Sequence, residues 1–284
     1  MKRDKQVEQE IESMRGLLSL VEAYQEIAAV RMRKVKKSVL SRREFMQGLN
    51  EAFAYIAFAY KLYRESLGET MRRTILNTNG KTISVLLSSN TGLYGDVIRK
   101  TFNLFQKDIR GKDTDIIIVG RLGKRFYDNS EMKKTYDYFE MTDKGIDEEN
   151  VKRLLESVIN YSNVVVYHGV FKSILAQTPG NTNITGEVLK IEENLSGYDA
   201  RFLFEPSVEK VAEHFEKQIL SLIFEQVVFE SGLSKYASRM VSLDQAAENI
   251  GERLEKLDFI RKKAKHESIN SSLQSNIFGG ILWT

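Results

Sequence analysis

The chain has 284 residues, of which 42 are Lys or Arg and 39 are Asp or Glu, so its formal net charge is only +3. This small positive excess does not indicate a nucleic-acid-binding protein. The chain has no cysteine, which excludes disulfides, thiol nucleophiles and thiolate metal sites. Only two prolines are present, and 42% of the residues are hydrophobic, which favours long uninterrupted elements over a loop-rich all-β fold. The sequence has no run of 18 consecutive apolar residues, so we predict no membrane span. The charged N-terminus lacks the pattern of a secretory signal.

Residues 1 to about 65 are predicted to form a long helix. Apolar positions in its first part recur at alternating spacings of four and three, interrupted only by Gln25, and this pattern is typical of a coiled-coil seam. The seam positions are Val7, Ile11, Met14, Leu18, Val21, Gln25, Ala28, Met32, Val35 and Val39. Residues 31–43 hold seven basic side chains and no acidic one. Such a segment is either a solvated helix face or a surface for an acidic protein partner.

Between about residues 70 and 200 the pattern changes. Short aliphatic runs at 82–88, 115–120 and 163–169 alternate with helical patterns at 94–109 and 151–161. Buried strands that alternate with helices predict a parallel sheet covered on both faces, of the Rossmann-like kind. A further strand is predicted at 183–191.

This middle segment carries no pattern of a catalytic or cofactor site. The loops GLYG (92–95) and GRLGK (120–124) lack the spacing of dinucleotide-binding and phosphate-binding loops, so we interpret them as ordinary turns between a strand and a helix. His168, His214 and His266 each lie without a neighbouring metal ligand in the sequence. We therefore predict no catalytic residue, no bound cofactor and no metal site.

The C-terminal segment is predicted to be a second long helix. Pro206 suits a first helical turn, and a helix from there to about Ser268 would be roughly 90 Å long. Its seam positions, again spaced by four and three, are Tyr236, Met240, Leu243, Ala247, Ile250, Leu254 and Leu257. The two seams predict one antiparallel intramolecular coiled coil; the alternative is two separate amphipathic helices on the middle domain. The predicted fold is thus α/β, with an N-terminal coiled-coil helix (1–68), an inserted α/β domain (69–201) and a C-terminal coiled-coil helix (202–284).

Several motifs along the chain resemble the γ subunit of F-type rotary ATP synthases. IAAVRMRK (27–34) is similar to that family's N-terminal helix motif, and GLYG (92–95) to its G-L-C-G turn. YHGVFKSILAQTP (167–179) is similar to the family's Y-N-x-F with a following Q-x-P. The most specific similarities are FLFEPS (202–207) to Y-L-Y/F-E-P and SRMVSLDQAAEN (238–249) to A-R-M-V-A-M-x-x-A-x-x-N.

This resemblance implies a rotor shaft that has no active site of its own. The implied partners are the alpha and beta subunits of the catalytic hexamer, the epsilon subunit and the c-ring, with no nucleic acid, at the cytoplasmic face of a bacterial plasma membrane. Residues implied to contact the c-ring are Phe202, Phe204 and Glu205. Residues implied to face the catalytic head or to brace the coil are Arg31, Arg33, Lys34, Arg239, Lys265 and His266.

The chain departs from the family pattern at a few positions. Phe202 stands where the family has Tyr, Lys235 replaces a Glu, and Lys265 stands where the family has an Arg, whose planar guanidinium Lys lacks. These departures leave open a γ-like shaft of a specialised ATPase head without a conventional c-ring. A coiled-coil scaffold and a free-standing α/β enzyme are further alternatives.

Overall fold

A computed structural model describes residues 2–66, 78–143, 148–185 and 205–281. The chain divides into two compact units. Residues 1–28 and 240–284 form one, which we call the helix-pair unit, and residues 29–239 form the other, the sheet unit. Helices α1 (Lys2–Ser66) and α6 (Val208–Ile281) each contribute to both units. The predicted long terminal helices are therefore confirmed.

Helix α6 begins directly after the segment that the sequence marks as a helix start. The Ser207 hydroxyl accepts a hydrogen bond from the Lys210 backbone N–H at 3.4 Å, and the Ser207 carbonyl accepts one from the Val211 N–H at 3.1 Å. A serine in this position satisfies an N–H group of the first turn that has no partner within the helix.

In the helix-pair unit the two helices run antiparallel, as predicted. Gln25 Nε2 donates to Asp244 Oδ1 at 3.1 Å, whereas Glu10 pairs with Arg253 at 2.6 Å, so residue numbers fall on α6 as they rise on α1. The apolar core of this unit consists of seam residues and their neighbours: Val21, Leu243 and Ile250, packed by Met14, Leu18, Ala246, Ala247 and Leu254. The surface ion pair adds little to stability, so apolar burial holds this unit together.

The sheet unit contains a five-stranded sheet in the order β3-β2-β1-β4-β5. The strands are β1 (Thr82–Leu87), β2 (Asp115–Val119), β3 (Asp137–Phe139), β4 (Asn163–Phe171) and β5 (Gln177–Asn183). β1 pairs in parallel with β2 and β4, and β2 pairs in parallel with β3, whereas β5 pairs antiparallel with β4. The three predicted aliphatic strands are confirmed, and β3 was not predicted.

Two details of the predicted sheet are wrong. The sheet is not wholly parallel, because β5 returns directly from β4 through a short turn and joins as an antiparallel edge strand. The strand predicted at 183–191 is also misplaced, since β5 ends at Asn183 and residues 184–185 are helical, while residues 186–191 lie outside the described part of the chain. β5 reads QTPGNTN and escapes prediction because an edge strand needs no apolar run.

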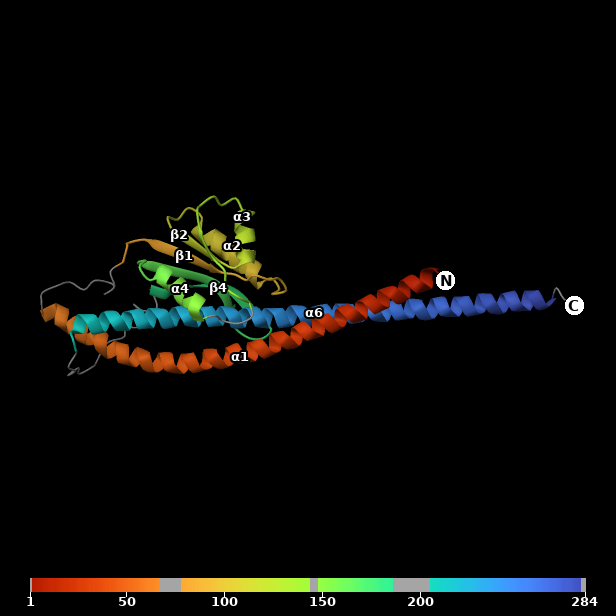
Figure 1. Ribbon diagram of the computed structural model, residues 1–284, viewed down its shortest axis with the longest axis horizontal. Coiled ribbons are helices and arrows are strands. Elements are labelled where there is room, and N and C mark those ends of the chain that lie inside the picture. Colours follow the sequence, from red (N-terminus) through yellow and green to blue (C-terminus); the bar gives the residue numbers. More distant parts are fainter. Residues whose placement is uncertain (1, 67–77, 144–147, 186–204, 282–284) are drawn as a thin grey trace. The chain divides into compact units, whose positions relative to one another are not determined.

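Helices cover both faces of the sheet (Figure 1). On one face, α2 (Val97–Ile109) and α3 (Arg121–Asp128) pack Phe102, Phe105 and Tyr127 against alternate strand residues such as Leu86 and Ile118. On the other face, α4 (Glu148–Val158) and α6 pack on the remaining strand positions. That second core includes Val85, Ile117, Val166, Leu154, Ile219 and Phe224. The near-continuous apolar strands β1 and β2 follow from this coverage of both faces.

Candidate functional site

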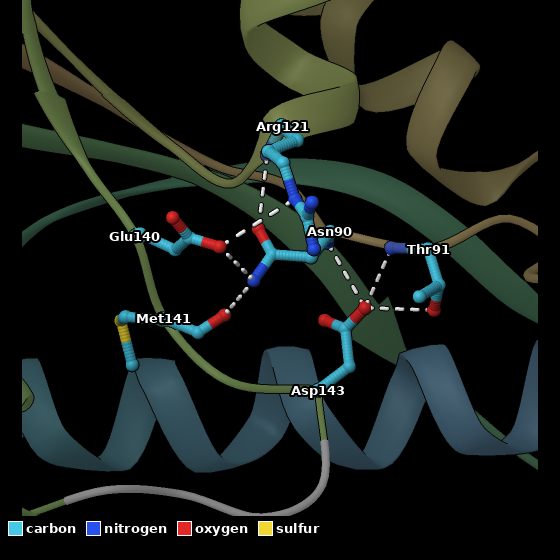
Figure 2. A network of polar contacts seen from close by, with 6 residues as sticks. All are labelled: Asn90, Thr91, Arg121, Glu140, Met141 and Asp143. Atoms are coloured by element: carbon cyan, nitrogen blue, oxygen red, sulfur yellow. Dashed lines mark hydrogen bonds and ion pairs between the residues drawn. The ribbon is translucent and has the colours of Figure 1, made fainter.

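The carboxyl ends of β1, β2 and β3 carry three loops that a single asparagine connects. The Asn90 side chain donates from Nδ2 to the Met141 carbonyl at 2.6 Å and accepts at Oδ1 from the Arg121 N–H at 3.0 Å (Figure 2). Asn90 follows β1, Arg121 begins α3 after β2, and Met141 follows β3. Ligands of open α/β sheets commonly bind at this edge, so this network is the natural candidate site.

In this chain the loop after β1 binds a carboxylate of the chain itself. Asp143 Oδ2 accepts hydrogen bonds from the Asn90 N–H at 2.9 Å, the Thr91 N–H at 2.7 Å and the Thr91 hydroxyl at 2.8 Å (Figure 2). Backbone N–H groups that converge in this way form an anion-binding nest. Because Asp143 takes all three donors, the nest is satisfied within the chain.

Both long helices attach to the same loops, and all of these contacts lie within the sheet unit. The Asp143 carbonyl accepts from Arg31 Nη1 of α1 at 3.2 Å and from the Tyr236 hydroxyl of α6 at 2.9 Å. One turn further along α6, Arg239 donates to the Gly92 carbonyl at 3.1 Å, and its guanidinium lies 4.3 Å from the centre of the Tyr94 ring. We use the name junction for the residues of these loops and of α1 and α6 that bind one another here. They are Arg31, Asn90, Thr91, Gly92, Tyr94, Asp143, Lys235, Tyr236, Ser238 and Arg239.

The junction is buried enough to change the acidity of its side chains. Burial raises the pKa of Tyr94, with a further contribution from the Asp143 carboxylate, and burial raises the pKa of Tyr236 to about 12. Both phenols therefore remain protonated hydrogen-bond donors at neutral pH. Burial of its ammonium group lowers the pKa of Lys235, although the residue as a whole is partly exposed.

Lys235 borders a small cavity of about 30 Å³ that is lined by both polar and apolar side chains. Its Nζ donates to the Ser88 carbonyl at 3.0 Å. The hydroxyls of Ser88 and Ser231 also line this cavity, and neither has a hydrogen-bond partner among the residues that the structure describes. A polar cavity of this size accommodates ordered water. Lys235 and Asp143 border the same cavity.

Comparison with known proteins identifies the family. A protein-family model described as ATP synthase matches residues 3–281. The chain belongs to this family. Two of its relatives are the ATP synthase gamma chains of Bdellovibrio bacteriovorus, 24% identical with 97% of this chain and 97% of that chain aligned, and of Geotalea daltonii, 24% identical with 97% and 96% aligned.

Solved structures of ATP synthases share the fold. The central stalk and c-ring structure of the Tetrahymena thermophila mitochondrial ATP synthase contains a chain that matches with a TM-score of 0.57 at 15% identity, covering 80% of this chain and 99% of that one. A chain of the Euglena gracilis mitochondrial ATP synthase matches with a TM-score of 0.53 at 16% identity, covering 88% and 93%. The α/β fold with two long helices is therefore that of known ATP synthase chains.

The residues implied by the resemblance to this ATP synthase family occupy two kinds of position. Arg239 is only 8% exposed, and Arg31 is partly buried, so both contribute to the junction. Arg33, Lys34, Glu205, Lys265 and His266 are exposed, whereas Phe202 and Phe204 lie outside the described residues. Of the seam positions singled out, Ile11, Val21, Met32, Leu243 and Leu257 are buried, and Leu18, Met240 and Leu254 are partly buried.

Sequence reasoning missed the residues that connect the loops. Asn90 and Asp143 were not singled out, because each lies in a polar turn and matches no motif. Their partners lie 51 and 53 residues away in the sequence, so no local pattern indicates the pairing.

Within the described residues no helix has an apolar stretch sufficient to cross a bilayer.

His168 lies within β4 and is a buried structural residue. Its ring nitrogens lie 3.0 Å from the Thr182 hydroxyl and 3.2 Å from the Gly169 carbonyl. Burial lowers its pKa, and the contact with Gly169 opposes this shift only in part. The folded chain therefore favours the neutral imidazole.

We expect this histidine to make the chain less stable in mild acid. The unfolded chain takes up the proton near pH 6.5, whereas the folded chain does so only at lower pH, so stability falls as the pH drops below about 6.5 and levels off below the folded pKa. His168→Gln should remove a slope of up to about 1.4 kcal/mol per pH unit. Urea unfolding at pH 7.5 and 5.5 measures this, and equal acid sensitivity of variant and wild type would contradict it.

Gly120 permits the close approach of the loops after β1 and β2. Its φ is +92°, and a Cβ on it would lie 2.8 Å from the Ser89 backbone nitrogen. We expect Gly120→Ala to destabilise the chain by about 2 kcal/mol or more, from backbone strain and the clash together. Gly111 has a φ of +77° and no atom within 4 Å of a built Cβ, so Gly111→Ala is the matched control. Equal unfolding free energies for the two variants would rule out the clash.

Proposed function

We propose that this chain is the central-stalk gamma subunit of an F-type ATP synthase. In this role it is the rotor shaft that couples ion flow through a membrane c-ring to ATP synthesis or hydrolysis in the catalytic hexamer. The observation that carries the proposal is the family match over residues 3–281, together with gamma chain relatives that align along 97% of this chain. The chemistry of ATP then takes place on other subunits, and this chain is a non-catalytic member of the complex.

The two long helices support this role. A shaft must resist bending and twisting, and antiparallel helices joined by an apolar seam meet that need better than a single helix does. The ion pair between Glu10 and Arg253 of this unit is exposed, and so are large apolar side chains such as Leu20 and Phe259.

The proposed partner contacts follow from the exposed residues. Arg33, Lys34, Lys265 and His266 face the alpha and beta subunits, because the exposed arginine and lysine side chains among them attract an acidic rim. Glu205, with Phe202 and Phe204, belongs to the foot on the c-ring, and the epsilon subunit binds the sheet unit. The complex lies at the cytoplasmic face of a bacterial plasma membrane, where this chain is a peripheral subunit.

The test is the purification of the tagged chain from its native membranes in mild detergent. We expect one copy per three alpha and three beta subunits, together with a c-ring and ATPase activity in the eluate. Recovery of the head without a ring would instead favour a specialised ATPase. Recovery without any ATPase subunit would overturn the proposal and favour a scaffold.

A charge-reversal pair separates the head contact from general association. We expect Arg33→Glu with Lys34→Glu to lower recovery of the alpha and beta subunits, and to do so more strongly at low salt, where charge attraction acts over a longer range. Lys107→Glu is the control, because Lys107 is also an exposed cation of the sheet unit but lies on α2, which covers the sheet, and not on the long helix α1. Equal recovery with both variants would contradict the proposed head contact.

A further inference from the structure

We infer that Asp143 is a positioning residue that fastens both long helices to the sheet, so that torque between the foot and the helices passes through the junction. This inference rests on the proposed function. It concerns no contact with a partner subunit. It concerns the internal connection by which one chain transmits load.

The first argument is that contacts from three elements converge on this one residue. The Asp143 carboxylate binds the loop after β1, and its carbonyl binds Arg31 of α1 and Tyr236 of α6. The bond from Arg31 is charge-assisted, which makes it stronger than a neutral hydrogen bond. Any substitution of Asp143 keeps the carbonyl that binds the two helices, but loss of the carboxylate frees this carbonyl from the loop after β1, and so loosens the attachment of both helices to the sheet.

The second argument is the position of the junction along the two helices. The sheet unit ends at Ala29 on α1 and at Arg239 on α6. Arg31 and Tyr236 each lie within one helical turn of those ends. The junction thus holds each helix close to the residue at which its part in the sheet unit ends.

The third argument is that α6 is attached at a second point close by. The Ser238 hydroxyl donates to the Tyr94 carbonyl at 2.8 Å, and Arg239 donates to the Gly92 carbonyl. Between these two carbonyls, Leu93 has a φ of +66°, a conformation that a leucine adopts only where its surroundings impose it. Two attachments resist sliding and rotation of α6 better than one, so the loop after β1 is held under constraint by the helix.

The experiment uses the assembled complex, with Asp143→Ala combined with Tyr236→Phe. We expect ATP hydrolysis to stay within about twofold of wild type, while the number of ions pumped per ATP falls about tenfold. The reason is that the loss of a hydrogen bond to a charged group lowers the population of the intact junction by about tenfold. Asp143→Asn keeps an oxygen that accepts the same donors, so it should restore most of the pumping. Asp113→Ala removes an exposed carboxylate of the same unit and should pump like wild type.

The outcomes separate this inference from the proposed function. Failure of the wild-type chain to assemble with ATPase subunits counts against the proposed function. Normal assembly with unchanged pumping in the double variant overturns the role of Asp143.

A second measurement applies if the double variant fails to assemble. Since the chain has no cysteine, Lys36→Cys and Lys107→Cys in the isolated full chain accept spin labels without background. We expect the distance distribution between α1 and α2 to broaden in the double variant. An unchanged distribution would overturn the inference.

Discussion

Phe224→Ala is expected to destabilise the sheet unit by about 3–5 kcal/mol, the usual cost of truncating a large buried aromatic side chain. Phe224 is 0% exposed and packs in the core between α6, α4 and the sheet. The truncation removes apolar contacts and leaves a cavity that a rigid sheet cannot close. Denaturant unfolding of the full chain, monitored by a spectroscopic signal of the β-sheet, measures the loss of unfolding free energy as a lower denaturant concentration at the midpoint.

Phe259→Ala provides the matched control for this prediction. It is the same substitution on the same helix, but Phe259 is 70% exposed. We expect the free energy of unfolding of this variant to stay within about 0.5 kcal/mol of wild type. Alanine is the better helix former, so comparable losses in the two variants would show that burial in the core does not account for the effect.

Leu243→Asp is expected to separate the helices of the helix-pair unit, at a cost of more than about 3 kcal/mol. Leu243 is 2% exposed and packs with Val21 and Ile250 in the core of this unit. An aspartate there buries a carboxylate beside apolar side chains without a cation to pair it. Amide hydrogen exchange should accelerate in residues 5–28 and 240–270, while the sheet remains protected.

The control for this second prediction is Asn249→Asp, which places the same carboxylate on an exposed position of α6. Its exchange pattern should match that of wild type. If Leu243→Asp left exchange in residues 5–28 unchanged, the apolar seam would not be what holds α1 to α6 in this unit.

Local patterns in the sequence were sufficient to predict the two helices and three of the strands. The heptad spacing of α1 and α6 is repeated over many turns, and the aliphatic runs of β1, β2 and β4 are unmistakable because both faces of the sheet are buried. β3 has only three residues, DYF, which is too short to show any period. β5 is a polar edge strand, and its pairing depends on the turn after β4 and not on its composition.

The junction could not be predicted in the same way. Its central bonds join Thr91 to Asp143, 52 residues later, and Asp143 to Tyr236, a further 93 residues along the chain. Long-range pairs of this kind leave no trace in spacing or composition. The turn GLYG and the helix segment SRMVS were noticed for their resemblance to one family, yet the sequence gives no sign that Arg239 of the helix lies on Tyr94 of the turn.

The carboxylate of Asp143 also competes with external anions for the backbone N–H groups of the loop after β1. A phosphate group that approached the loop after β1 would compete with a carboxylate tethered to the same chain, whose effective concentration lies in about the millimolar range or above and whose bonds are already formed. The nucleotides and phosphate of an ATP-converting complex therefore meet no open anion nest here. We therefore expect the connection between helices and sheet to be the same at high and at low concentrations of ATP and phosphate.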